Sequence, residues 1–286
     1  MTEDTPQSPV ETRGPTPYAT ERHYLIEGKR YVWRARDHRR GLRHVLRPAG
    51  HTAWRPERLN TPIGWGFVVG SLLFALCALL ALQPGLSAAL GLSEEAVNTG
   101  FFVGSIFFTT AAYLQLYQAA NAGAQHPHPV TPPPARVLFG WKPDDIGWLA
   151  SALQFVGTLL FNISTAAALH PSGNWLRDDL VIWVPDIFGS ILFLSSGYLA
   201  YAEASHGYWS LSPKDLSWQV VATNLAGCVA FMISAFYAFV PPAGQADAMV
   251  QHSVFWTLIG AVFFAAGAGL MLRESATLTP QAPLPA

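Results

Sequence analysis

Few residues in this sequence have both a type and a setting suited to chemistry, and Asp186 is the clearest of them. It lies in an otherwise apolar stretch, directly after Pro185. A carboxylate inside a membrane-spanning helix marks a functional site by default. One interpretation is therefore a proton or cation site, formed with polar residues of neighbouring segments: Ser164, Gln154 and Asn224. The alternative is a carboxylate near the outer interface that bonds a neighbour or caps a helix broken at Pro185.

Two histidines invite a metal hypothesis, but their setting argues against it. His126 and His128 lie in the stretch QHPHPVTPPPAR of the linker 121–145. Alternating prolines keep such a chain extended, and a structural zinc site needs further ligands that the neighbouring sequence does not supply. The pattern favours a polyproline-like spacer, and we expect no bound metal or other cofactor.

Acidic residues recur at matching places near the ends of two apolar segments. Glu203 and Glu274 follow their segments' glycine by fourteen residues, and Gln118 has the same place in another segment. A carboxylate beside a helix carboxyl terminus is mildly unfavourable. The recurrence suggests pairing with basic residues of the amino-terminal segment, or with Lys214 and Arg273. Solvated residues at the membrane boundary are the alternative.

Catalytic motifs do not appear. The sequence contains no hydrolase elbow, phosphate loop, paired catalytic carboxylates, zinc-protease pattern or pair of haem-ligating histidines inside the apolar segments. The absence of these motifs argues against the common enzyme classes, so we predict a protein that is not an enzyme.

The elements that must position these residues are membrane helices. Of 286 residues, 51% are hydrophobic and only 12% are charged, which is too few charges to solvate a globular surface of this size. Six segments approach the roughly 20 apolar residues that cross a bilayer: 63–83, 99–120, 146–169, 181–203, 217–240 and 253–273. The predicted fold is an all-α polytopic bundle, with a transmembrane domain at 61–275.

Basic residues set the expected topology and partners. The two termini and every second connection between the six segments lie on the same side of the membrane, and they hold all of the 17 Lys and Arg except Arg177. The positive-inside rule therefore places both termini in the cytoplasm. Residues 1–22 and 276–286 have the composition of disordered tails. The segment 23–60 is basic and aromatic, directly before a membrane segment. We expect it to contact anionic lipid headgroups of the bilayer or to set topology, and we expect no nucleic-acid binding.

One pattern links all six segments: a Gly followed four residues later by Phe. It predicts three tandem two-helix hairpins (63–120, 146–203 and 217–273) around a pseudo-threefold axis. Gly leaves a notch in which an aromatic ring of the partner helix can pack. The six motif pairs are Gly70 and Phe74, Gly104 and Phe108, Gly157 and Phe161, Gly189 and Phe193, Gly227 and Phe231, and Gly260 and Phe264.

The motifs also predict a register. With both motifs of a hairpin at equal depth, each Gly should face the partner's Phe, as in Gly157 with Phe193. Extending each seam by three residues places polar residues opposite one another: Asp186 with Ser164, Gln154 with Ser196, and Ser234 with Thr257. The first hairpin has only Phe67, Ala111, Cys77 and Phe101 at these places, so we expect it to be the dry, structural unit. Trp65, Trp148 and Trp218 begin the odd helices as interface anchors.

The motif helices resemble the YrhK-like family of uncharacterised bacterial integral membrane proteins. The resemblance rests on the Gly-Ser-(Ile or Leu)-x-Phe helices with small residues, Tyr and Leu after them, as in 104–114 and 189–199. It covers roughly residues 60–275 and not the amino-terminal segment. It implies a bacterial inner (plasma) membrane location and carries over no catalytic residues.

Two functions follow from this sequence. The first is a non-enzymatic scaffold or interaction protein of the plasma membrane with a basic cytoplasmic arm, acting with a protein partner or as a homo-oligomer. The second is a small transporter or channel that uses the polar surface near Asp186. An axis blocked by Phe rings favours the scaffold, and a polar cavity that reaches one leaflet favours the transporter.

Overall fold

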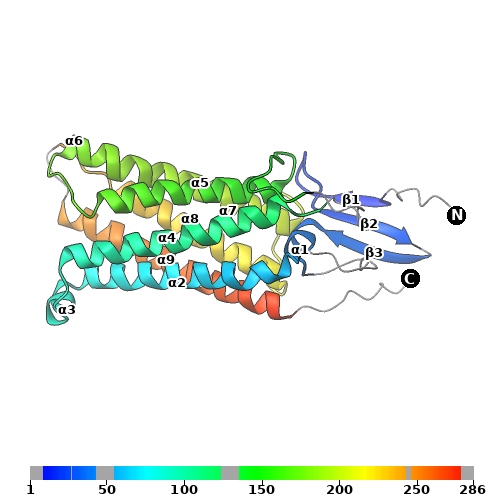
Figure 1. The fold of residues 1–286 in the computed structure, drawn as a ribbon, viewed down its shortest axis with the longest axis horizontal. Coiled ribbons are helices and arrows are strands. Elements are labelled where there is room, and N and C mark those ends of the chain that lie inside the picture. Colours follow the sequence, from blue (N-terminus) through cyan, green and yellow to red (C-terminus); the bar gives the residue numbers. More distant parts are fainter. Residues whose placement is uncertain (1–8, 27, 43–54, 124–134, 243–245, 278–286) are drawn as a thin grey trace.

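The computed structural model describes residues 9–26, 28–42, 55–123, 135–242 and 246–277. These residues form a bundle of long helices with a small unit of three strands and one short helix at one end (Figure 1). We call the end of the bundle that carries the strands the sheet end, and the opposite end the far end.

Six helices in the described ranges are long and apolar enough to cross a membrane. Each predicted segment falls on one of them, so the prediction of six helices long and apolar enough to span a membrane is confirmed. They are α2 (Glu57–Leu82), α4 (Glu94–Ala120), α5 (Ile146–Ala167), α7 (Val184–Ser205), α8 (Leu216–Tyr237) and α9 (Asp247–Ala276). The short helix α3 (Pro84–Ala89) lies in a connection at the far end, and α6 (Trp175–Asp178) lies at the same end, where it extends the span of α7 back to Trp175 (Figure 1).

The six helices form a closed ring. Helices that follow one another in the chain pack side by side, in the order α2, α4, α5, α7, α8 and α9, and α9 packs back against α2. Side chains from every helix therefore meet along one central axis. Residues on the outer surface include many exposed Leu, Val, Ile and Phe, as expected of helices that face lipid.

The glycines of the motif lie against phenylalanine rings in all three hairpins, in the expected pairs. A Cβ added at any of the six glycines would lie 2.7 to 3.3 Å from a ring carbon of the partner's Phe. A methyl group does not fit at the shorter of these distances, so glycine is what allows the rings to pack there. Backbone carbonyls also come close, with Gly189 O 3.2 Å from the added Cβ at Gly157.

The six motif phenylalanines close the axis of the ring. Their rings contact one another in the order 74, 108, 264, 193, 161, 231 and back to 74, with centroids 4.9 to 6.2 Å apart. Most of these pairs are edge to face, the geometry that aromatic quadrupoles favour. We call this set the Phe cluster, and it divides the interior of the bundle into two halves.

The polar pairs expected along the seams are formed in part. Ser234 Oγ and Thr257 Oγ1 lie 2.7 Å apart, as predicted. Gln154 and Ser196 do not bond each other, because Ser196 instead donates to the backbone oxygen of Ala150 at 2.7 Å. Among the described residues no hydrogen bond joins Asp186 to Ser164. A short hydroxyl can reach a carbonyl of the facing helix, which register arguments based on side chains alone overlook.

Pro185 does not break its helix. The chain runs from α6 through a π-helical turn, η1 (Asp179–Trp183), directly into α7, whose second residue is Pro185. A wider turn absorbs the extra residue ahead of the proline, which lacks an N–H. The first hairpin is apolar along its seam as expected: Phe67 packs on Phe108, and Phe74 on Phe101.

The amino-terminal unit departs from the all-α prediction. Strands β1 (Glu11–Arg13), β2 (Glu21–Ile26) and β3 (Lys29–Arg34) form an antiparallel sheet, followed by α1 (Ala35–Arg40). The expected disordered tail 1–22 thus contains β1 and the start of β2. Tyr24, Trp33 and Ala35 supply a small core that the composition of the tail alone does not reveal. The spacer histidines and most of the tail 276–286 lie outside the described residues.

Candidate functional site at the sheet end

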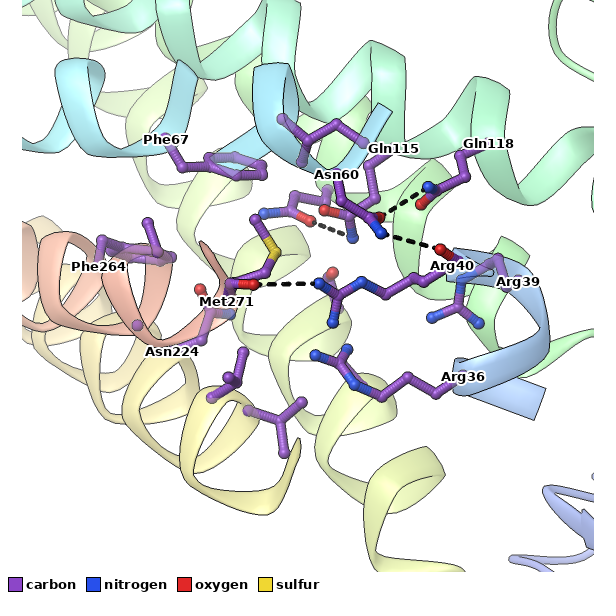
Figure 2. Close-up of a pocket in the computed structure, with 18 residues that line it drawn as sticks. Arg36, Arg39, Arg40, Asn60, Phe67, Gln115, Gln118, Asn224, Phe264 and Met271 are labelled. Carbon is purple, nitrogen blue, oxygen red and sulfur yellow. Dashed lines mark hydrogen bonds between the residues drawn. The ribbon is translucent and has the colours of Figure 1, made fainter. Parts of the chain in front are cut away.

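A cavity of the bundle lies between α1 and the Phe cluster. It has a volume of about 60 Å³, room for two to four water molecules at roughly 15–30 Å³ each. Arginines of α1 line its outer side, and Phe67 and Phe264 line its inner side. Its walls carry five amide side chains: Asn60, Gln115, Gln118, Gln154 and Asn224. We call this cavity the vestibule (Figure 2).

Arg39 closes one side of the vestibule by pairing with Glu203. Its Nη1 and Nη2 donate to Oε1 and Oε2 of the carboxylate at 2.5 and 2.8 Å, a two-pronged contact. Glu203 is 1% exposed and Arg39 5%. Burial alone would lower the pKa of Arg39, but the Glu203 carboxylate outweighs it and holds that pKa above its usual value. The arginine is therefore permanently charged.

Glu274 binds the other two arginines of α1. Arg36 Nη2 donates to its Oε2 at 2.9 Å, and Arg40 Nη1 donates to the same oxygen. Ser217 Oγ donates to the second oxygen at 2.5 Å. Burial lowers the pKa of Arg40 to about 10 despite the neighbouring carboxylate. Glu274 thus joins α1, α8 and α9 at one point.

The place of Gln118 matches those of Glu203 and Glu274, but its partners are neutral. Its Nε2 donates to Asn60 Oδ1 at 2.9 Å and to the backbone oxygen of Pro56 at 2.7 Å. Asn60 Nδ2 in turn donates to the backbone oxygen of Arg40 at 2.9 Å. α1 is therefore held at three places around the ring, twice by charge and once through an amide (Figure 2).

Recurrence of an acid or amide at the ends of α4, α7 and α9 had suggested pairing with the amino-terminal basic segment. The ion pairs confirm this hypothesis, and the solvated alternative is wrong because both carboxylates are buried. The lipid contact expected for segment 23–60 does not describe Arg36, Arg39 and Arg40, whose side chains point into protein. A buried carboxylate without a cationic partner is strongly destabilising. The three arginines therefore pair with Glu203 and Glu274 and not with lipid headgroups.

A glycine at the start of α5 makes the Arg39 contact possible. A Cβ added at Gly147 would lie 1.6 Å from Arg39 Nη1 and 2.8 Å from Glu203 Oε1. Asp145, two residues earlier, caps α5 by accepting from the N–H groups of Gly147 and Trp148. Any side chain at 147 would push the guanidinium away from Glu203.

The four residues of the predicted intramembrane site are divided between two places. Gln154 and Asn224 line the vestibule, and Gln154 accepts a hydrogen bond from Gln115 at 3.3 Å. Asp186 and Ser164 are not among its lining residues. They lie beyond the Phe cluster, because both are on the far-end side of their helices' motif phenylalanine or glycine. The structure brings together two of the four.

Sequence reasoning did not single out Arg36, Arg39, Arg40, Asn60 or Gln115. A signal for the arginines was present, since positions 36, 39 and 40 share one face of a helix. The helix itself is only six residues long, and the bases around it do not distinguish it from a segment lying on lipid.

A second contact ties the sheet to the bundle through a histidine. His206 ends α7 in the left-handed conformation, with φ 51°, and its Nδ1 lies 3.1 Å from Thr20 Oγ1. Its Nε2 lies 3.4 Å from the buried carboxylate of Glu21, which also accepts from Arg34 Nε at 2.9 Å. Burial lowers the pKa of His206 although Glu21 opposes this, while Arg34 reinforces it.

This histidine should make docking of the sheet sensitive to pH. A pKa below 6.5 in the docked state means that docking favours neutral His206, so its contribution is complete above pH 6.5 and is lost as pH falls below that value. Glu203 and Asp215 oppose the shift and limit it. We expect the unfolding temperature of the wild-type protein to decrease as the pH is lowered from 7.5 to 5.5. His206→Asn, which tolerates the backbone conformation, should show a flatter profile; equal slopes would contradict the assignment.

Comparisons with known proteins give no assignment. No family model matches the chain, and no curated protein or solved structure matches it. Within the described ranges, no group of three or more His, Cys, Asp and Glu side chains is placed to hold a metal ion. The case for function therefore rests on the geometry at the sheet end.

Proposed function

We propose that this protein is a non-enzymatic scaffold of the plasma membrane, in which the six-helix bundle holds the sheet unit in a fixed position at the membrane surface. The observation that carries the proposal is the set of buried bonds from α1 to Glu203, Glu274 and Asn60. A closed Phe cluster on the axis fits a bundle that anchors and does not conduct. The sheet unit would then meet a protein partner or a second copy of the chain.

The orientation, lipid contacts, origin and membrane location in this proposal rest on the amino-acid sequence. The distribution of Lys and Arg supports a cytoplasmic sheet end and both termini in the cytoplasm. Exposed basic residues of the sheet, such as Lys29 and Arg30, are suited to anionic headgroups. Shared motifs at equal offsets support an origin by duplication of a two-helix unit. The same motifs support kinship with the YrhK-like family and a bacterial inner membrane.

One observation favours a second candidate function, a small transporter or channel. The vestibule gives the interior a polar half on the side of the sheet, lined by Gln154 and Asn224. Such a half-path resembles one state of an alternating-access cycle more than a solid core. Transport would require the Phe cluster to part, so the two candidates differ in whether water ever crosses it.

Cysteine accessibility tests this difference. Asn224→Cys and Asp186→Cys, each in a Cys77→Ser, Cys228→Ser background, report on the two sides of the Phe cluster. A scaffold predicts that an impermeant thiol reagent applied from the sheet side does not reach position 186, and that one applied from the far side does not reach position 224. Labelling of both positions from one side would replace the scaffold by the transporter, and ion or proton flux would then be measured.

A further inference from the structure

The arginines of α1 occupy a place that would be negatively charged without them. Among the described residues, every ion pair of Glu203 and Glu274 is made by Arg36, Arg39 or Arg40. The remaining buried charge on α1, Asp37, belongs to the same helix and would leave with it. Asp145 also acts on Arg39 through its charge. Without α1, two unpaired carboxylates would therefore lie beside the vestibule, behind the arginines that line it now.

Below α1, the vestibule offers groups that a small organic cation can use. Among the described residues, the one hydrogen bond of Asn224 is the weak one that its amide nitrogen donates to Cys228 Sγ at 3.9 Å, so its oxygen can accept from a ligand. Phe67 and Phe264 line the inner side, and aromatic faces attract cations. Among the described residues that line the vestibule, the arginines of α1 are the only charged ones, so nothing below α1 would hold an anion.

The geometry of the contact at Glu203 indicates which class of organic cation would bind. Glu203 receives two parallel N–H groups from Arg39, an arrangement that matches the planar fork of a guanidinium and not the single point of an ammonium. The contact takes place in a slot that Gly147 leaves open. The site that α1 fills is thus shaped for a flat, two-pronged donor.

We propose that α1 is an intramolecular lid, and that the vestibule beneath it is a binding site for a small guanidinium-type cation whose place the side chain of Arg39 takes in the closed state. α1 is suited to this role because four of its five buried residues are charged, so its departure exposes little apolar surface. Gly41, in the left-handed conformation at φ 63°, ends the helix abruptly. The closed state, with its buried bonds from α1, is the scaffold of the proposed function, and the open state is added to it. The inference holds whether or not the Phe cluster opens.

Binding of methylguanidinium to full-length protein in lipid nanodiscs tests the proposal. In Arg39→Ala, millimolar methylguanidinium should raise the unfolding temperature by several degrees with a saturable dependence. N-methylurea, neutral and of similar shape, should not, and neither should phosphate. Adding Glu203→Gln to Arg39→Ala should abolish the response. Arg30→Ala, which removes an exposed arginine of β3, is the matched control and should behave as wild type.

Gly147→Ala keeps the test decisive if Arg39→Ala does not fold. The added methyl must displace the Arg39 guanidinium without removing any charge. Labelling of Asn224→Cys from the sheet side, in the background without native cysteines, should then become at least tenfold faster. Methylguanidinium should not slow it, because the added methyl group also fills the slot in which the cation would bind. No saturable response in Arg39→Ala, the same response without Glu203, stabilisation by phosphate in place of the cation, or an unchanged labelling rate in Gly147→Ala would overturn the proposal. None of these outcomes bears on labelling across the Phe cluster.

Discussion

Replacing Glu274 by Ala is expected to lower the free energy of unfolding by about 3–5 kcal/mol, the typical result of leaving a buried charge without its partner. The glutamate is 6% exposed and accepts bonds from both Arg36 and Arg40. Its loss strands two guanidinium groups against each other in an enclosed space, and it also removes the acceptor of Ser217. Reversible unfolding in bicelles, followed by steric trapping, gives the free energy directly.

The destabilisation should come from the stranded arginines and not from a lost contact as such. A triple variant, Glu274→Leu with Arg36→Met and Arg40→Met, replaces all three charges by apolar groups of similar length. Buried ion pairs exchanged for packed apolar groups often cost nothing. We therefore expect the triple variant to lie within about 1–2 kcal/mol of wild type. A triple variant as unstable as Glu274→Ala would show that packing, and not charge, is what Glu274 provides.

Arg273, next to Glu274 in sequence, supplies a matched control. It is exposed at the end of α9. Arg273→Ala should change the free energy of unfolding by no more than about 0.5 kcal/mol, as is usual for surface substitutions. Comparing the two variants shows whether the loss of stability comes from removing a buried, paired charge or from removing any charge at this end of α9.

The sequence specified the bundle well because membrane helices depend on few rules. Length and apolar composition give the spans, and a backbone that must satisfy its own hydrogen bonds in lipid leaves helices as the only choice. The register followed from Gly157 and Phe193 and their counterparts, since a notch and a ring at equal depth admit one pairing. Local residue types were sufficient for both.

The site was less accessible to the same reasoning. Its arginines meet Glu203 and Glu274 across more than 160 and 230 residues of chain, and composition is silent about contacts at such separations. The sheet was missed because an amino-terminal segment rich in Thr, Pro and acids resembles a tail, although Tyr24 and Trp33 pack beneath it. Ser196 was given the wrong partner because its hydroxyl reached a backbone carbonyl.

Gly157→Ala is expected to destabilise the bundle by about 1–3 kcal/mol, the usual cost of overpacking. The added Cβ would lie 2.7 Å from Phe193 Cδ2 and 3.2 Å from Gly189 O. The ring cannot turn aside easily, because Phe161 and Phe264 hold it with centroids at 4.9 and 5.9 Å. Thermal unfolding in detergent and unfolding by steric trapping both report the loss.

Two further variants separate the clash from the loss of a glycine. Gly269→Ala, in α9 with nothing within 4 Å of the added Cβ, should stabilise by about 0.4–1 kcal/mol because the unfolded chain loses freedom. Adding Phe193→Leu to Gly157→Ala shortens the opposing side chain and should recover part of the loss caused by Gly157→Ala. If Phe193→Leu lowered the stability of Gly157→Ala by as much as it lowers that of the wild-type protein, the two effects would be additive. The glycine and the ring would then act independently. The Phe cluster would then be a consequence of helix packing and not the contact that sets the register.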